Sequence, residues 1–154
     1  MTPLMLRTRR LLSLLTSVAI CLLALSGCGG KKPVTVKGKL VLPSTMKLAE
    51  TDIVQISFVP QEEKGLAGSA KPSLTDLSFV VKDTNGKGVV PGKYKVTVKF
   101  DAYAGMKDGQ KRADAMKPIN DSYGLLKSKL TYEVTLDEEQ NITVDLIKGT
   151  VTKN

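Results

Sequence analysis

Residues 93–100 read KYKVTVKF, so charged or hydroxyl side chains alternate with large apolar ones at every step. Successive side chains of a β-strand point to opposite faces, and a period of two is typical of a strand with one buried face. We therefore expect a strand here. Its inward residues are Tyr94, Val96, Val98 and Phe100, and its outward residues include Lys93, Lys95 and Lys99.

The same alternation recurs in five other segments, which are residues 34–42, 54–58, 77–82, 129–136 and 141–146. Residues 67–70 predict a short seventh strand at a sheet edge, and residues 106–116 have room for only a turn or two of helix. Six or seven short strands, each with one apolar face, favour an all-β antiparallel sandwich of two sheets. The 154 residues of the chain fit one such domain.

Turn residues separate the expected strands. Asn85-Gly86 predicts a type I′ turn, because that turn needs two residues that tolerate a positive φ. Pro91-Gly92 precedes the strand at residues 93–100. The polar segment at residues 137–140 predicts a tight turn, so that the last two strands pair as a hairpin.

The N-terminus has the pattern of an export signal. Residues 1–10 carry three arginines and no acid, and residues 11–24 are almost wholly apolar, which is too short for a comfortable bilayer span. Leu25, Ser26, Gly27 and Cys28 then match every position of the lipobox of bacterial lipoproteins. The resemblance implies that residues 1–27 are cleaved and that Cys28 carries a diacylglycerol and an acylated amino group. A plain signal peptide with a chance cysteine is the alternative.

Processing at Cys28 would set the composition and location of the mature protein. Cys21 would leave with the signal peptide and Cys28 would be blocked, so no free thiol would remain for disulfide or redox chemistry. Removing the three arginines leaves 20 Lys and Arg against 15 Asp and Glu, a net side-chain charge of +5. We expect an exported protein, lipid-anchored to a membrane of the bacterial cell envelope. Residues 8–12, Thr-Arg-Arg-Leu-Leu, also resemble a twin-arginine export signal, and the alternative is export as an unfolded chain.

Residues 83–98, DTNGKGVVPGKYKVTV, resemble the end of carboxypeptidase regulatory-like, transthyretin-like domains, whose signature is D-x-x-G followed by P-G-x-Y-x-V-x-V. Residues 34–40 and 56–60 are similar to the first and second strands of that family. Small envelope lipoproteins of planctomycete-type bacteria join this pattern to a lipobox and share a tail similar to residues 119–134. The resemblance implies an immunoglobulin-like (Ig-like) sandwich in the envelope and no particular activity. Residues 43–52 depart from the short turn that is usual in the family.

The expected organisation is therefore a signal peptide at residues 1–27, a lipidated tether at 28–33, a β-sandwich domain at 34–148 and a C-terminal tail at 149–154. This sandwich can bury about twenty large apolar side chains, so neither a metal nor a disulfide is needed for stability.

The composition excludes several kinds of site. Without histidine, triads that use an imidazole base and histidine-ligated metals are impossible.

Asp83-Thr84-Asn85-Gly86 looks like half of a calcium loop, but position 12 from Asp83 is Tyr94 rather than a bidentate Glu. The favoured interpretation is a turn in which Asp83 caps backbone N–H groups.

Two surfaces remain as candidates. Lys93, Lys95 and Lys99 share one strand face and could attract anionic lipid, cell-wall polymer or polysaccharide, flanked by Lys37, Lys39 and Lys129. The alternative is a solvated sheet face. In residues 101–127, a cation or sugar could bind to Asp101, Asp108, Asp114 and Asp121, but their spacing favours a loop packed by Met116, Ile119 and Tyr123.

The function expected from these residues is a non-enzymatic structural or interaction module on the membrane. The runner-up is a module that binds polysaccharide or another anionic envelope component through the lysines, and a hydrolase comes third. We expect no cofactor, no metal and no nucleic-acid partner, since the mature chain has one arginine and no aromatic interleaved on its lysine face.

Overall fold

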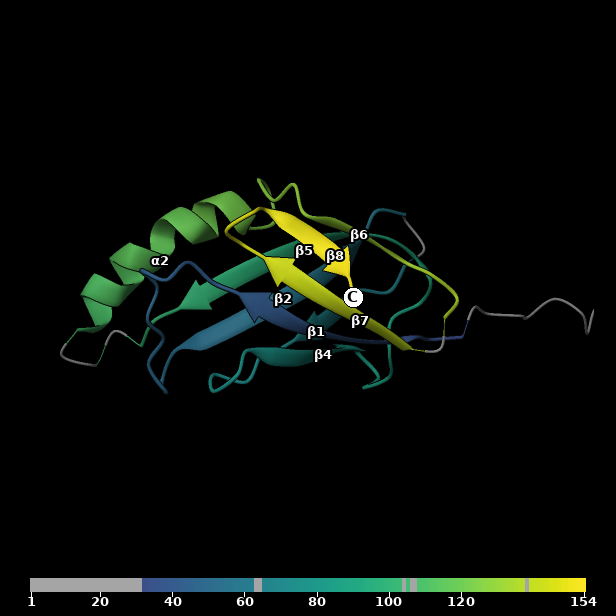
Figure 1. Cartoon of the computed structure of the whole chain (residues 1–154), viewed down its shortest axis with the longest axis horizontal. Helices are drawn as coiled ribbons and strands as arrows, with labels where there is room; N and C mark the ends of the chain where they lie inside the picture. The colour runs from purple at the N-terminus through teal and green to yellow at the C-terminus, as the bar shows by residue number, and fades with distance from the viewer. Residues whose placement is uncertain (1–31, 63–64, 104, 106–107, 138) are drawn as a thin grey trace, which may run out of the picture. The chain divides into compact units, whose positions relative to one another are not determined.

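The computed structural model describes residues 32–154, except for 63–64, 104, 106–107 and 138. This part of the chain is mostly β-strand with one helix, and all of its buried core residues form one cluster. Its elements are β1 (Thr35–Val41), β2 (Ile53–Pro60), β3 (Gly68–Ala70), β4 (Ser78–Asp83), β5 (Gly92–Asp101), α2 (Gly109–Tyr123), β6 (Thr131–Val134), β7 (Glu139–Asp145) and β8 (Thr150–Lys153) (Figure 1).

The strands form one continuous sheet in the order β6-β5-β2-β3-β4-β1-β7-β8. The sheet curls until it is nearly closed, and its two end strands, β6 and β8, contact each other. An all-antiparallel sheet is wrong, because β1 runs parallel to β7, with Gly38 opposite Ile142. A parallel pair needs a long crossover, and here five strands and the helix separate β1 from β7 in the chain.

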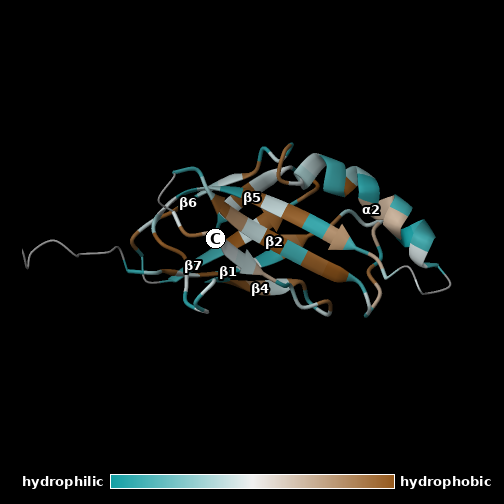
Figure 2. Ribbon diagram, turned by 180° about the vertical axis from the view of Figure 1, so that it is seen from behind, coloured by the Kyte–Doolittle hydropathy of each residue, from teal (hydrophilic) through white to brown (hydrophobic). Residues whose placement is uncertain are grey.

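The expected inward faces are confirmed. Strand residues alternate between apolar and polar along the ribbon in Figure 2. The buried residues of the six predicted strands are Val34, Val36, Leu40, Val54, Ile56, Phe58, Phe79, Val81, Tyr94, Val96, Val98, Phe100, Leu130, Tyr132, Val134, Ile142, Val144 and Leu146. The exceptions are Leu42 and Leu77, which are partly buried and pack against the core, and Leu136, which lies beyond the end of β6 and is exposed.

Aromatic rings fill the interior around Phe58. Its ring centroid lies 5.9 Å from that of Tyr94 and 6.4 Å from that of Tyr132, both at tilted or edge-on angles that aromatic pairs favour. The Tyr94 hydroxyl donates to the Val90 carbonyl at 2.6 Å, and the Tyr132 hydroxyl donates to Gln140 Oε1 at 2.6 Å. Burial raises the pKa of both tyrosines. Each buried ring thus keeps a partner for its polar end.

Three strand expectations need correction. Residues 67–70 do contain a strand, β3, but it lies between β2 and β4 rather than at an edge. Residues 149–154, expected to be a tail, contain β8, which pairs with β7. The hairpin of the last two predicted strands is also wrong, because β6 pairs with β5 while β7 pairs with β1 and β8.

Gln140 links the end of β6 to the start of β7, although these two strands do not pair with each other. Its side chain is buried, accepts from Tyr132 and donates to the carbonyl and hydroxyl oxygens of Thr135. These side-chain bonds connect the end of β6 with the start of β7, and no backbone ladder joins the two strands. The polar segment is therefore a crossover rather than a hairpin turn.

The turn after β4 also differs from the expected type I′ turn. Gly86 has φ +75°, but Asn85 is not among the described residues with a positive φ. The Gly86 N–H donates to the Asp83 carbonyl at 3.0 Å, so Thr84 and Asn85 are the central residues. The Asp83 carboxylate accepts from the N–H groups of Asn85 and Lys87 at 2.9 and 2.8 Å. The capping role expected for Asp83 is confirmed.

Helix α2 is longer than the turn or two that we expected. Met116 is buried, and Ile119 and Tyr123 pack against the core, so the residues predicted to hold this region do so. Their spacing of three and four residues places them on one helix face. Pro118 lies inside the helix, where it has no N–H to donate to the carbonyl four residues earlier.

The helix covers the open edge of β5. Strand β6 pairs only with the first half of β5, up to Lys95. Further along, the Asn120 amide donates to the Phe100 carbonyl and accepts from the Phe100 N–H, both at 2.8 Å. An unpaired strand edge is a template for wrong pairing, and here a side-chain amide takes the place of the missing strand.

Candidate functional site

An open groove of about 650 Å³ crosses the outer faces of β4, β1 and β7. Its polar lining comes from five separate parts of the chain, which are β1, β4, β7, the segment after β3 and the residue that follows β8. The side chains available to a ligand are Lys37, Lys39, Lys71, Ser73, Ser78, Asn141 and Asn154. Ammonium, hydroxyl and amide groups together favour an anionic or highly hydroxylated ligand.

The lysines of this groove differ in their partners. Lys37 Nζ lies 2.8 Å from Glu139 Oε2, and this hydrogen bond lowers the pKa of Glu139. Within the part of the chain that the structure describes, Lys39 and Lys71 have no carboxylate within ion-pair distance. The register places Lys39 opposite Ser78 on β4 and Thr143 on β7. The groove therefore offers two uncompensated positive charges next to neutral polar groups.

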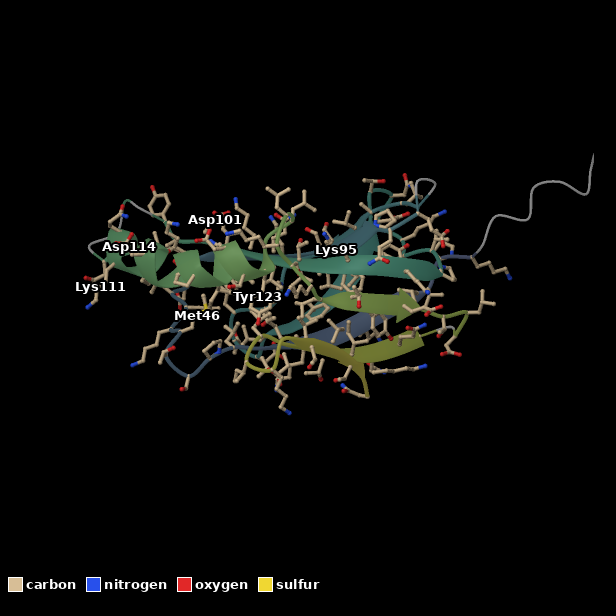
Figure 3. The ribbon with its side chains drawn as sticks, turned by 90° about the horizontal axis from the view of Figure 1, so that it is seen from above. Met46, Lys95, Asp101, Lys111, Asp114 and Tyr123 are labelled. Atoms are coloured by element: carbon tan, nitrogen blue, oxygen red, sulfur yellow. The ribbon has the colours of Figure 1, made fainter. Side chains whose placement is uncertain are left out.

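The predicted lysine face is present on the outer side of β5, but each of its lysines has a neighbour. Lys99 Nζ lies 2.9 Å from Asp101 Oδ2, and Lys93 is the cross-strand partner of Glu133. Lys95 Nζ donates to the Leu125 carbonyl at 3.5 Å. Figure 3 shows Lys95 on β5, well away from Lys111 and Asp114 of α2. Opposite charges nearby weaken the attraction of this face for an anion.

The lysines expected to flank that face do not all do so. Lys37 and Lys39 lie on β1, which is separated from β5 by β2, β3 and β4 in the sheet. They belong to the groove instead. Lys129 comes two residues before β6, the neighbour of β5, and its side chain is exposed. Strand order, which the alternation of side chains does not specify, decides this grouping.

The acidic residues of the segment at 101–127 do not form a cation site. Asp101 pairs with Lys99, Asp121 pairs with Lys117 at 3.1 Å, and Asp114 accepts from Gln110 at 3.0 Å. Asp108 precedes α2, and its carbonyl accepts the N–H of Arg112. Among the described residues, no three acidic side chains gather closely enough to hold a metal ion.

An ion pair that the sequence did not suggest joins α2 to the segment between β1 and β2. Asp52 is fully buried at its side chain, and Arg112 donates to its Oδ1 from Nε at 3.3 Å and from Nη2 at 3.2 Å. Asp52 Oδ2 accepts the Ala49 N–H at 2.8 Å. Met46, from the same segment, packs against the core beneath the helix (Figure 3). This pair docks the helix and is structural.

The lipobox, Leu25, Ser26, Gly27 and Cys28, lies outside the described residues, as do the rest of the signal peptide and the first part of the tether. Within the described residues, no helix has the length and apolar character to cross a bilayer.

Comparison of the chain with protein-family models, curated proteins and solved structures finds no match. The function is therefore inferred from the chemistry of the chain's own residues.

Proposed function

We propose that the protein is a lipid-anchored bacterial envelope lipoprotein whose β domain is a non-enzymatic interaction module. The observation that carries this proposal is the complete lipobox ending at Cys28, directly after an apolar segment with an arginine-rich start. Two or three acyl chains at Cys28 would hold the protein on a membrane stably, as one chain would not.

The position of the domain supports the proposal. Among the described residues, the first that is buried is Val34, 3% exposed, and it comes only six residues after Cys28. Six residues span at most about 20 Å when fully extended. The tether would therefore keep the domain close to the lipid headgroups, where it can meet other envelope components.

We also propose that the nearly closed sheet is an Ig-like, transthyretin-like sandwich. Tyr94 supports this, because its hydroxyl donates to a backbone carbonyl four residues upstream, at Val90, close to the start of β5. A tyrosine near a strand start that binds back in this way is a hallmark of Ig-like sandwiches. Residues 91–94, Pro-Gly-Lys-Tyr, are also those that resemble the family signature.

Replacing Cys28 tests the anchoring. In the Cys28→Ser variant, the thiol needed for acylation is absent, so the precursor should stay at full length. Wild-type protein should be found in the membrane fraction and be extracted only by detergent. Cys21→Ser is the matched control, because it removes a thiol from the apolar segment and should leave processing unchanged. A shortened, released form of Cys28→Ser would refute the lipoprotein assignment.

A second candidate function is binding of an anionic envelope polymer in the groove. Its support is the pair of lysines without carboxylate partners, Lys39 and Lys71, beside Asn141 and two serines. Long-range attraction by exposed charges fades at physiological salt, where the screening length is about 8 Å, whereas a built site is screened less.

Binding of an acidic polysaccharide to the protein separates the two lysine surfaces. If the groove is the site, Lys39→Gln with Lys71→Gln should abolish saturable binding at 0.15 M salt. Replacing Lys93, Lys95 and Lys99 by Gln should then have little effect. The opposite ranking would favour the face of β5, and equal small losses would indicate nonspecific attraction.

A further inference from the structure

Two leucines project into solvent from the connection between α2 and β6. Leu126 is 93% exposed and its neighbour Leu125 is 58% exposed. We call residues 124–129 the leucine loop. Isolated exposed leucines are common, but two adjacent ones at the tip of one loop form a patch that water solvates poorly.

Hydrogen bonds fix the base of the leucine loop to β5 and to the end of α2, so the two leucines keep a defined position at its tip. Ser128 is buried, its hydroxyl donates to the Val96 carbonyl of β5 at 2.6 Å, and its N–H donates to the Gly124 carbonyl at 2.9 Å. The Lys127 N–H also donates to Gly124 at 3.2 Å. A loop tied at both ends keeps its tip directed outward.

Three lysines lie close to the tip of the leucine loop. Lys95 contacts the Leu125 carbonyl. Lys127 and Lys129, which follow the leucines in the chain, line a hollow of about 430 Å³ together with Asp121, Tyr123 and Gly149. Within the described residues, none of the three lysines has a carboxylate at ion-pair distance. Asp121, which also lines the hollow, has its charge offset by Lys117 at 3.1 Å, and Asp145 lies 3.9 Å from Lys148.

The turn between β7 and β8 extends the same surface. Tyr123 donates to the Leu146 carbonyl at 2.8 Å, which fixes this turn against the end of α2. Ile147 at the turn is 63% exposed, and Lys148 beside it is exposed as well. The surface therefore combines three exposed aliphatic side chains with four lysines from three elements.

We propose that this surface is a second membrane contact, in which Leu125 and Leu126 enter the headgroup region of an anionic bilayer. Lys127 and Lys129 bind lipid phosphates there, with the hollow receiving a headgroup. Long lysine side chains place their stems along apolar surface and their charges at the interface. Protein interfaces instead deplete lysine, so the mixture of lysine and leucine favours a lipid surface over a protein partner.

The inference rests on the proposed function in one respect, because acylated Cys28 would bring the domain to a membrane. The two can be tested separately. Residues 32–154 form a compact unit that contains every buried core residue the structure describes. This fragment lacks Cys28, so its binding to vesicles does not depend on acylation, and a failed Cys28 test would leave the vesicle result unaffected.

The chain has no tryptophan, which allows a single reporter to be placed. In the fragment, Leu126→Trp should show a blue-shifted emission when vesicles of phosphatidylglycerol and phosphatidylcholine are added at 0.1 M salt. Leu136→Trp is the matched control, because Leu136 is 79% exposed in a different loop, and its emission should stay unchanged. An unshifted Leu126→Trp, or equal shifts in both variants, would overturn the proposal.

Co-sedimentation with the same vesicles measures the contribution of each group. Leu126→Ser should weaken binding about tenfold, and Lys127→Gln with Lys129→Gln about fivefold per lysine. Leu136→Ser and Lys82→Gln are the controls and should bind as the parent does. Neutral vesicles should bind at least tenfold more weakly. Equal binding to neutral vesicles, or a lipid-free dimer abolished by Leu126→Ser, would overturn the membrane assignment.

Discussion

Replacing Asn120 by alanine should destabilise the domain, because it removes two hydrogen bonds from the open edge of β5. The side chain makes two hydrogen bonds of 2.8 Å to the backbone of Phe100, a residue that is 1% exposed. A buried backbone group that loses its partner costs about 1–3 kcal/mol. Asn120 is itself only half-buried, so water can reach part of the site, and we expect about 2–4 kcal/mol for the two groups together.

Urea unfolding of residues 32–154 measures this loss. With a slope of about 2 kcal/mol per molar urea, the midpoint of Asn120→Ala should fall by about 1–2 M. Gln110→Ala is the matched control, because the one side-chain hydrogen bond of Gln110 among the described residues goes to the exposed Asp114 on the same helix, and it should stay within about 0.5 kcal/mol. A midpoint for Asn120→Ala within the same narrow range would refute the idea that this amide replaces a strand at the edge of β5.

Further predictions concern packing and charge. Val98 is fully buried, so Val98→Asp should prevent folding or cost several kcal/mol, as read by urea melts. A Cβ at Gly38 would clash with the Phe79 ring and lie 2.9 Å from the Ile142 carbonyl oxygen, so Gly38→Ala should lower the free energy of unfolding by about 1–3 kcal/mol in the same urea melts. The hydrogen bond from Lys153 lowers the pKa of Asp137 below 3.8. The small stabilisation from this ion pair is therefore fully present above about pH 3.8, the ordinary pKa of the carboxyl group, and is lost as pH falls through the lowered pKa of Asp137. Lys153→Gln should return the pKa of Asp137 towards 3.8 in an NMR titration, and an unchanged pKa would contradict the pairing.

The positions of the strands could be predicted because each strand buries one face, and this leaves a local period of two in the sequence. Val96 and Val98 are buried and Lys95 and Lys99 beside them are half-buried and exposed, as alternation requires, although Thr97, expected on the outer face, is also buried. Pairing is different, since it depends on segments far apart in the chain. The parallel contact of β1 with β7, and the crossover at Gln140 in place of a hairpin, have no local signature.

Helix α2 was underestimated for a physical reason. Pro118 and a polar composition hide the pattern, although Met116, Ile119 and Tyr123 recur at helical spacing. Most of the stability of such a helix comes from packing rather than from intrinsic propensity. Here the packing is supplied by residues 43–52, which carry the buried Asp52, and by the open edge of β5. Neither partner is visible from the helical segment alone.

The candidate sites could also be predicted only where a local pattern reports them. The lysines of β5 were found from their shared face, but the neighbours that offset their charge, Glu133 and Asp101, follow from register and side-chain position. The groove of Lys39 and Lys71 requires the order of β4, β1 and β7. The exposure of Leu125 and Leu126 runs against their hydropathy, because two adjacent leucines predict core rather than surface.

The claim that the protein is held on a membrane by lipid at Cys28 can be tested most directly at its N-terminus. Mass spectrometry of the N-terminal peptide from detergent-extracted protein should show that the mature chain begins at Cys28. That residue should carry a diacylglyceryl group on sulfur and an acyl group on its amino nitrogen. A mature chain that begins at another residue, or that contains an unmodified Cys28, would contradict the account.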